Sequence, residues 1–332
     1  MKRIKQYIDQ ANLSRFRTYF QILAFVVIVY GGYLGINIGD KTPAFACPYS
    51  PGSSGTCYLV AVQHGLHLEW SSLFGFRGLA LLTGLGTFVL FFVVFNKAWC
   101  GFVCPFGTLQ DWITKLRKFF GFRFSRYDEA SFKKLKIIKY VFLVLLILIP
   151  LAMSNSFFGL PKVSDDMSAP FCQICPGRTI APLLVGDTSE IFVDFTNKTT
   201  MVMSVLGLIF TALFFVGSFF KKRFFCFFCP MSALQYMFSK VGVLRLTKNG
   251  DNCTRCGNCS RVCDMGIASI ADDIVSTNAV ADDCMMCFKC VEACPEPDCL
   301  DVKVFKGNIF SSTSEGFFKR YGESELADQS KK

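Results

Sequence analysis

The chain has 332 residues, a formal net charge of +10 and an apolar composition, with 52% hydrophobic and only 18% charged residues. It contains 38 phenylalanines and 17 cysteines but only two histidines. The positive charge does not indicate a nucleic-acid partner, because the basic residues are grouped beside apolar segments rather than on a surface of their own.

Four apolar segments are long enough to cross a bilayer, which takes about 20 residues of helix. They cover residues 19–38, 74–95, 137–156 and 201–220. A buried helix of a soluble protein would show a polar face at helical period, and these segments show none. We therefore predict an α-helical integral membrane domain with four transmembrane helices over residues 1–240.

The distribution of Lys and Arg predicts the orientation of these helices. Nine basic residues follow the second segment, whereas only Lys41 follows the first, and three basic residues against five acidic ones follow the third. Loops rich in Lys and Arg stay in the cytoplasm. The chain is therefore expected in the inner (cytoplasmic) membrane of the cell, in contact with lipid, with both termini in the cytoplasm and loops 39–73 and 157–200 outside.

Two pairs of cysteines lie in the loops predicted outside. We call Cys47, Cys57, Cys172 and Cys175 the outer cysteines. An oxidising compartment favours disulfides among them. Cys172 and Cys175 form a C-x-x-C-P motif, which suits an external metal or redox site. Disulfides and a metal or redox site are therefore nearly equal interpretations, with disulfides slightly favoured. His64 and His67 share this side, either as further ligands or simply as polar residues at the interface.

Two Cys-Pro motifs follow the second and fourth segments, on the side predicted to be cytoplasmic. We call their members, Cys100, Cys104, Cys226 and Cys229, the inner cysteines. Similar residues follow both motifs, which indicates an internal duplication. Thiols stay reduced in the cytoplasm, so four thiolates at two helix ends predict a third metal or cluster site. The alternative is four buried cysteines that act as small hydrophobic residues.

The spacing C-x-x-C-x-x-C-x-x-x-C occurs twice near the C-terminus. It is typical of ferredoxins with two [4Fe–4S] clusters, in which the fourth cysteine of each run binds the cluster of the other run. The predicted ligands are Cys253, Cys256, Cys259 and Cys294 for cluster 1, and Cys284, Cys287, Cys290 and Cys263 for cluster 2. Zinc is the alternative, disfavoured by two complete runs in tandem.

These runs predict an α+β ferredoxin domain of the bacterial 2[4Fe–4S] type over residues 241–305, followed by a polar tail at 306–332. Cys299 belongs to neither pattern and is expected to be a packing residue. Because iron–sulfur clusters exchange electrons one at a time, the chain is predicted to carry electrons.

The Cys-Pro motifs and the tandem runs together resemble a known family. The chain is similar to the NapH-type quinol-dehydrogenase membrane subunit of periplasmic nitrate reductase systems, and to the membrane and ferredoxin portions of nitrous-oxide reductase regulators. Those proteins carry a C-x-x-x-C-P motif after each of two membrane helices, then a tandem cubane ferredoxin domain in the cytoplasm. The resemblance covers residues 15–300 and implies an oxidoreductase subunit, although the second motif, C-x-x-C-P, is one residue shorter.

The sequence lacks the residues of two common kinds of redox cofactor site. Both histidines lie in one outer loop, which excludes a transmembrane haem held by two histidines, and no G-x-G-x-x-G motif indicates a dinucleotide site. A quinol is therefore the predicted mobile substrate, with electrons passing between the quinone pool and a partner redox protein, an iron–sulfur protein or a cytochrome. Gln110 and Asp111 are candidates for proton handling or helix capping. The alternatives are a maturation protein that supplies electrons or metal to another metalloenzyme, and an inert membrane anchor.

Overall fold

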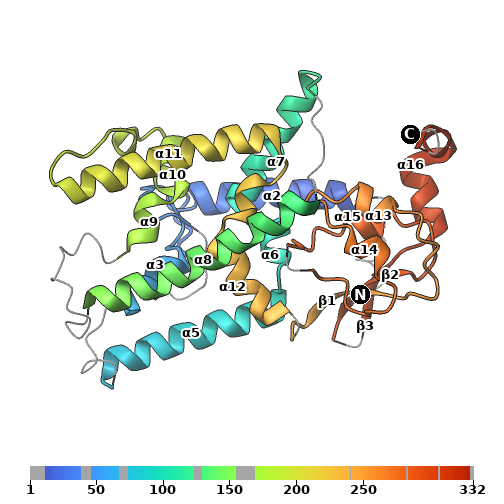
Figure 1. Cartoon of the computed structure of the whole chain (residues 1–332), viewed down its shortest axis with the longest axis horizontal. Helices are drawn as coiled ribbons and strands as arrows, with labels where there is room; N and C mark the ends of the chain where they lie inside the picture. Colours follow the sequence, from blue (N-terminus) through green and yellow to red (C-terminus); the bar gives the residue numbers. More distant parts are fainter. Residues whose placement is uncertain are drawn as a thin grey trace. The chain divides into compact units, whose positions relative to one another are not determined.

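The computed structural model describes residues 12–38, 46–66, 74–122, 129–154, 169–239, 241–281, 283–305 and 307–329. The chain divides into two compact units, which Figure 1 colours by sequence. The first unit comprises Met1–Ile22, Phe92–Val103 and Gln235–Lys332, and the second comprises Leu23–Phe91 and Cys104–Leu234. Both ferredoxin runs and Cys100 belong to the first unit, whereas the outer cysteines and the other three inner cysteines belong to the second.

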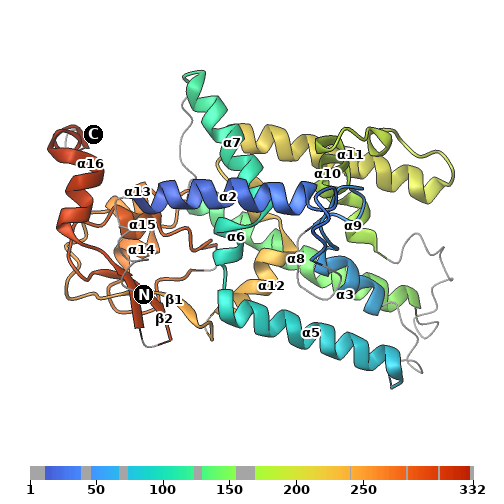
Figure 2. The same cartoon turned by 180° about the vertical axis from the view of Figure 1, so that it is seen from behind.

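The first unit contains a three-stranded antiparallel sheet in the order β1-β2-β3 (Figure 2). Its strands are β1 (Leu244–Lys248), β2 (Leu300–Val304) and β3 (Gly307–Ser311). Leu246, Leu300 and Val302 are at most 1% exposed, so one face of the sheet packs into the unit. The cysteine runs lie on loops and on the short helices α13 (Asn258–Arg261) and α15 (Lys289–Glu292), and α14 (Ser269–Asp272) lies between the runs in the sequence. This is the α+β arrangement expected for the ferredoxin domain.

The sheet extends past the residue at which we expected the ferredoxin domain to end. β3 lies within the predicted polar tail, 306–332, and pairs with β2 at Val302↔Phe310. Helix α16 (Ser314–Gln329) follows it. The five residues of β3 show no alternation of apolar and polar side chains from which a strand could be predicted. Its conformation therefore depends on the hydrogen bonds that it makes with β2.

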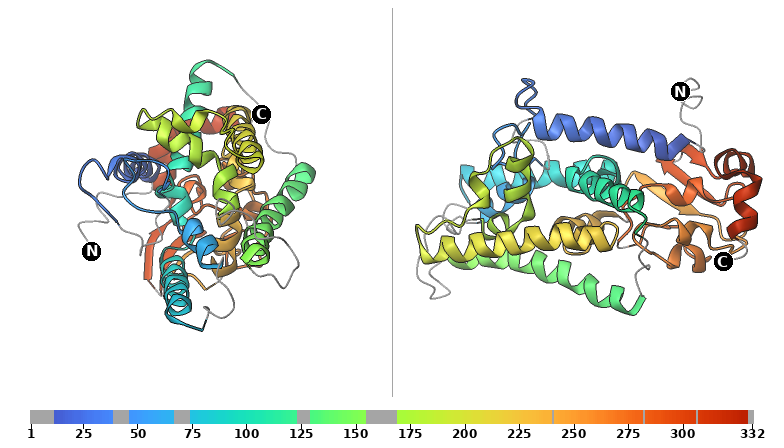
Figure 3. Two further views of the ribbon diagram at one scale, coloured as in Figure 1. Left: turned by 90° about the vertical axis from the view of Figure 1, so that its left-hand side faces the viewer. Right: turned by 90° about the horizontal axis from the view of Figure 1, so that it is seen from above.

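Long apolar helices form the frame of the second unit (Figure 3). They are α2 (Leu13–Tyr30), α5 (Phe76–Phe95), α8 (Glu129–Ser154) and α11 (Lys198–Phe220), of which α2 and α5 extend into the first unit. The shorter helices are α3 (Tyr58–Leu66), α6 (Ala98–Phe102, in the first unit), α7 (Pro105–Phe119), α9 (Pro170–Ile174), α10 (Pro176–Leu184), η4 (Ser189–Ile191), η5 (Phe224–Phe227) and α12 (Pro230–Ser239). Helices α7, α9 and α10 pack against α11, and α3 packs against α8.

Much of the second unit is organised around α11. Phe214 is 1% exposed, and its ring centroid lies 6.1 Å from that of Phe106 and 5.5 Å from that of Phe225. At the end of α11, the Arg117 guanidinium donates hydrogen bonds of 2.8 and 2.7 Å to the carbonyls of Phe219 and Phe220. The last carbonyls of a helix lack partners within it. Arg117, one of the basic residues used to orient the helices, therefore caps α11 as a buried side chain.

Helix α2 ends at Tyr30 rather than at residue 38, where the apolar segment ends. A glycine pair follows it. The N–H of Gly32 donates to the Gly52 carbonyl at 2.9 Å, and a Cβ atom on Gly31 would lie only 2.7 Å from the Ser54 Cβ. Because the neighbouring loop approaches the backbone this closely, only glycine fits. The chain leaves the helix at this contact although its residues remain apolar.

Two described helices, α2 and α11, are long and apolar enough to cross a membrane, with mean hydropathies of 1.3 and 2.2 over their most apolar windows. The apolar portions of α5 and α8 are shorter, at Leu81–Phe95 and Ile137–Ala152. Among the described residues, two of the four predicted transmembrane helices are thus long and apolar enough to span a membrane, by length and composition alone. The other two form as helices, but their apolar stretches are shorter than we expected.

Candidate functional site

The four predicted ligands of cluster 1 line one cavity of the first unit. They are Cys253, Cys256, Cys259 and Cys294, and Cys299 lines the same cavity. Burial raises the pKa of Cys259 to about 11, and the Cys294 thiol is among the further causes. A cysteine of the second run therefore lies beside the first three cysteines of the first run. Cys299 packs next to them and contacts the carbonyl of Asn249.

The predicted ligands of cluster 2 also come together across the two runs. Burial, and then the thiols of Cys287, Cys284 and Cys263, raise the pKa of Cys290 well above its ordinary value. Burial likewise raises the pKa of Cys263 to about 11, with Cys287 as the next cause. Cys263 is thus a neighbour of the second run, although its sequence places it at the end of the first.

The two runs share an unusual backbone conformation. In each run, the residues before and after the second cysteine have a positive φ. These residues are Arg255, Gly257, Met286 and Phe288, with φ between 48° and 76°. Residues other than glycine rarely adopt this conformation, and alternation with ordinary residues turns backbone N–H groups towards an anion. The Met286 N–H lies 3.4 Å from the Cys284 Sγ, as expected of a loop that stabilises thiolates.

A single metal ion and an iron–sulfur cluster require different distances between their cysteine ligands. A zinc ion holds four ligands within about 2.3 Å of one point. Among the described residues, no three His, Cys, Asp or Glu side chains gather closely enough to hold one metal ion, and the ferredoxin cysteines are among them. In a cubane each thiolate binds a different iron, so its four cysteines need not gather around one point. The donor set of each run, four cysteines and no histidine, fits such a cluster.

Helix α6, which carries Cys100, packs directly on the second ferredoxin run within the first unit. A Cβ atom on Gly101 would lie 2.5 Å from the carbonyl oxygen of Met285 and 3.4 Å from the Cys287 Cα. The rings of Phe102 and Phe288 lie 5.7 Å apart. The glycine in the middle of the first Cys-Pro motif therefore lets this motif contact the loop of cluster 2.

The two Cys-Pro motifs differ by one residue, and their first cysteines lie in different kinds of helix. Cys100 lies in the α-helix α6, whereas Cys226 lies in the 3₁₀-helix η5. The last cysteines have the same local position in both motifs. Cys104 directly precedes Pro105, where α7 begins, and Cys229 directly precedes Pro230, where α12 begins.

Two glutamines connect the motifs reciprocally. Gln110 donates from its Nε2 towards the Cys226 Sγ at 3.8 Å, and its Oε1 accepts from the Phe225 N–H at 3.0 Å. The Cys100 Sγ lies 2.9 Å from the Gln235 Oε1. Each glutamine follows the last cysteine of its own motif by six residues and contacts the first cysteine of the other motif. The duplicated sequence could have identified Gln235, which we did not single out as a functional residue.

Three inner cysteines lie together in the second unit. Burial raises the pKa of Cys226 to about 11, and Cys104 is among the further causes; burial and then Cys104 and Cys226 raise the pKa of Cys229. Cys100 belongs to the first unit. The buried Arg223 guanidinium lowers the pKa of Cys104 and Cys226 against the effect of burial. A cation beside these cysteines favours their thiolate form.

The side chains of Gln110 and Asp111 make contacts with residues in and beside the second Cys-Pro motif. The Arg223 Nε donates to the Asp111 Oδ1 at 2.9 Å, in an ion pair that is 2% and 16% exposed at its two side chains. Gln110 is fully buried and accepts from Ser218 in addition to the contacts described above. Both residues thus hold the second motif in place, whether or not they also handle protons.

The outer cysteines occupy a place that the sequence did not indicate. A Cβ atom on Gly207 of α11 would lie 2.9 Å from the Gln173 carbonyl, between Cys172 and Cys175. Phe106, two residues after Cys104, contacts α11 at Phe214. Seven residues of helix separate Gly207 from Phe214, a rise of about 10.5 Å. We expected the two sets on opposite sides of about 30 Å of hydrocarbon; instead α9 and α10 fold back along α11 towards Cys104.

The remaining predicted outer residues are less informative. All four outer cysteines are free thiols in the structure, as are the other thirteen cysteines. His64 lies at the end of α3 with an exposed side chain. His67 lies outside the described residues.

Comparison with known families identifies iron–sulfur domains in the chain. The 4Fe–4S binding domain family matches the chain twice, at residues 77–123 and 203–249, which are the two helix–Cys-Pro–helix repeats. The 4Fe–4S dicluster domain family matches residues 245–295. The chain therefore carries 4Fe–4S binding domains of the ferredoxin type, and the match in duplicate confirms the internal repeat. These domains define an iron–sulfur protein of the electron-transfer class.

Curated relatives point in the same direction. The chain is 28% identical over 217 residues to the uncharacterized protein MJ0750 of Methanocaldococcus jannaschii, which covers 64% of this chain and 75% of that protein. It is 25% identical over 215 residues to the "Putative electron transport protein YccM" of Escherichia coli, over 52% of that protein. It is 22% identical over 200 residues to the protein NirI of Paracoccus denitrificans, over 25% of that protein. No solved structure matches the chain.

Proposed function

We propose that this protein is a membrane-bound iron–sulfur subunit that connects the quinol pool to a partner redox protein. The observation that carries the proposal is the packing of α6 on the loop of cluster 2, where Gly101 meets Met285. One end of the first Cys-Pro motif therefore contacts the ferredoxin, and the other end continues into the helical second unit. When bound, the clusters would supply one-electron storage, and the cysteines assigned from the sequence would hold them.

Exposed apolar side chains support a position in the membrane. On α11, Val202, Ile209, Leu213 and Val216 are each about half exposed. Such continuous apolar surface is not left in contact with water by soluble monomers. We infer that these side chains face lipid, that four helices span the inner membrane, and that the ferredoxin domain lies in the cytoplasm as the Lys and Arg distribution predicts.

This topology predicts the outcome of reporter fusions. A reporter that is active only outside the cytoplasm should stay silent when fused after Lys332, and should be active when inserted beside Ser54. The expected difference is close to all-or-none, because a folded domain crosses the bilayer only through translocation. Western blots of both fusions control for expression. Activity after Lys332 together with silence at Ser54 would reverse every assignment of compartment.

An apolar cavity of the second unit is suited to the quinol. Seven phenylalanines line it, including Phe142 of α8 and Phe210 of α11, and Cys175 lies at its edge. Phe225 and Phe228, which flank Cys226 and Cys229, also line it. Ligand cavities are typically apolar and aromatic with few polar groups. A planar, lipid-soluble ring held here would lie beside cysteines of both the inner and the outer set.

Reduction of the clusters by a quinol tests this proposal. In anoxic, purified protein, a quinol analogue should produce the EPR signals of reduced clusters within the time of mixing. Gly101→Ala should slow the reduction of the ferredoxin clusters several-fold, because the added Cβ meets the Met285 carbonyl at 2.5 Å. Gly84→Ala is the matched control, since a Cβ atom at Gly84 has no neighbour within 4 Å.

Two results would count against the proposal. Clusters that dithionite reduces but the quinol does not would remove the link to the quinone pool. Transfer of iron or electrons from the protein to an apo-metalloenzyme, without quinol-driven reduction, would instead favour a maturation protein.

A further inference from the structure

The outer cysteines have no role in the proposed quinol-to-ferredoxin route, yet two separate segments bring them together inside the second unit. Cys47 and Cys57 flank a loop that ends where α3 begins. Cys172 lies in α9, and Cys175 lies between α9 and α10. More than a hundred residues separate the two pairs in the sequence, so their proximity is a tertiary feature.

Gln63 joins α3 to α9 at the cysteines themselves. This side chain is fully buried. Its Nε2 donates to the Cys172 Sγ at 3.1 Å, and its Oε1 accepts from the Phe171 N–H at 3.0 Å. Gln63 lies in α3, six residues after Cys57, which directly precedes this helix. The amide of Gln63 therefore supplies a hydrogen bond to one thiol of the set and fixes the backbone beside it.

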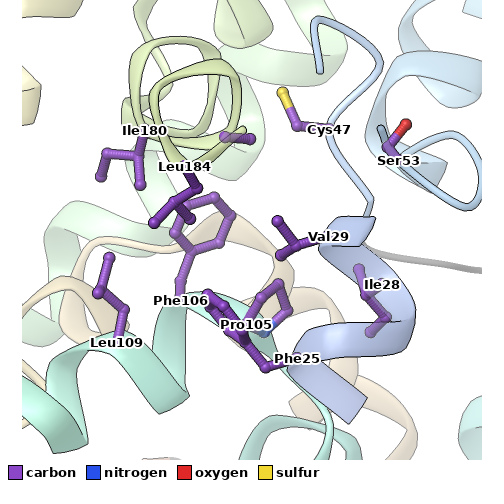
Figure 4. A pocket seen from close by; sticks show the side chains of 11 residues that line it. Phe25, Ile28, Val29, Cys47, Ser53, Pro105, Phe106, Leu109, Ile180 and Leu184 are labelled. Carbon is purple, nitrogen blue, oxygen red and sulfur yellow. The ribbon is translucent and has the colours of Figure 1, made fainter. Parts of the chain in front are cut away.

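The other half of the loop packs against α10. Cys47 and Ser53 line a cavity together with Ile180 and Leu184 of α10, and Figure 4 shows the Cys47 side chain beside that helix. The Ser50 hydroxyl donates to the Ala181 carbonyl at 3.4 Å. The loop from Cys47 to Cys57 thus contacts α10 at one end and, through α3, contacts α9 at the other.

The four thiols are close enough to act on one another. Burial raises the pKa of Cys47, Cys172 and Cys175, and in each case two other outer cysteines raise it further. Cys57 is among the causes for all three. Cys47, Cys172 and Cys175 each therefore have two outer cysteines nearby rather than a single partner, as in a site that all four share.

Two of the four cysteines lie at the start of a helix. Cys175 is the N-cap residue of α10, and Cys57 directly precedes α3. The backbone N–H group of Gly177 interacts with the Cys175 thiol, and those of Leu59 and Val60 interact with the Cys57 thiol. Helix N-termini stabilise negative charge through such donors. The site thus offers four sulfur ligands and amide donors directed at two of them.

We propose that Cys47, Cys57, Cys172 and Cys175 together hold an iron–sulfur cluster, separate from the clusters of the ferredoxin and from the inner cysteines. The donor set is the same as that of each ferredoxin run, four cysteines. Soft thiolates select iron–sulfur clusters, copper(I) or zinc, and the last two need ligands around a single ion.

The position of the site relative to Cys104 gives the cluster a place in electron transfer. Cys104 is among the causes that raise the pKa of Cys57 and of Cys175, and it also acts on Cys229. Cys57 and Cys175 therefore lie near Cys104 within the second unit. A cluster there would take up one electron at a time, and two such transfers, with release of two protons to solvent, would oxidise one molecule of the quinol named above.

The test compares iron content and thiol state in the full-length protein, purified without oxygen. Cys172→Ser/Cys175→Ser should lose about four irons per chain if the cluster is a cubane, or about two if it is binuclear, and should lose one EPR signal. The ferredoxin signals should remain. Ser50→Ala changes the same loop without removing a sulfur and should keep all the iron. In wild-type protein denatured without reductant, all four outer cysteines should react with an alkylating agent.

Three outcomes would overturn the proposal. One is an iron content that the double variant does not change. A second is protection of the outer cysteines from alkylation until a reductant is added, which would show two disulfides. The third is one equivalent of zinc lost with the variant. The alkylation result and the iron and zinc content of the wild-type protein need no variant, so they can overturn the proposal even if the double variant fails to fold. Quinol-driven reduction of the ferredoxin can succeed or fail independently of all three.

Discussion

Replacement of Cys263 by serine is expected to remove the cluster bound mainly by Cys284, Cys287 and Cys290, although Cys263 ends the other run. The reason is spatial: Cys287 and Cys263 are neighbours, and Cys263 is one of the thiols that raise the pKa of Cys290. The loss should amount to about four irons per chain, since each cubane holds four. Iron analysis and EPR of the reduced protein measure it.

Cys259→Ser is the matched control for this experiment. Cys259 lies four residues earlier, in α13, and lines the cavity of cluster 1 with Cys294. Its replacement should spare cluster 2 and remove cluster 1, with the same loss of iron. Two variants one helical turn apart should therefore remove different EPR signals. If both remove the same signal, the interlocked assignment is wrong.

The second large effect is expected at the inner cysteines. We propose that Cys100, Cys104, Cys226 and Cys229 hold one shared cluster, so that Cys104→Ser and Cys229→Ser should each abolish the same EPR signal and about four irons beyond the ferredoxin's own. Burial and then the Cys104 thiol raise the pKa of Cys229, which makes these two cysteines neighbours. Four residues of chain allow Cys100 to lie at most roughly 14 Å from Cys104.

The reciprocal glutamine contacts support this shared site. Gln110 contacts Cys226, and Cys100 contacts Gln235, so the glutamine of each repeat contacts the first cysteine of the other motif. Cys299→Ser also replaces a cysteine by serine, but Cys299 is neither an inner cysteine nor a predicted ferredoxin ligand. This variant should leave the EPR signal of the inner cluster intact. Iron that stays at the ferredoxin's own level, unchanged by Cys104→Ser or Cys229→Ser, would show that the inner cysteines hold no cluster.

The sequence by itself predicted the ferredoxin ligands and determined the repeats. The spacing of Cys253–Cys263 and of Cys284–Cys294 specifies interlocked ferredoxin runs because a cubane needs three closely spaced thiolates and a fourth from elsewhere. The positions of the apolar segments specified α5, α8 and α11 within a few residues, apart from the start of α8. The duplicated Cys-Pro motifs specified a repeat that the family comparison confirms. All of these features depend on local spacing, which the sequence contains directly.

Only the tertiary structure decided where the segments between these features go. Gly31 ends α2 because Ser54 approaches it, and the five residues of β3 form a strand because β2 is beside them. The first cysteines of the two motifs lie in different helix types, Cys100 in an α-helix and Cys226 in a 3₁₀-helix. The outer cysteines lie about 10.5 Å along α11 from the level of Phe106 because Gly207 allows α9 to pack there. Each of these depends on a close contact between residues far apart in sequence, and no local pattern of side chains encodes such a contact.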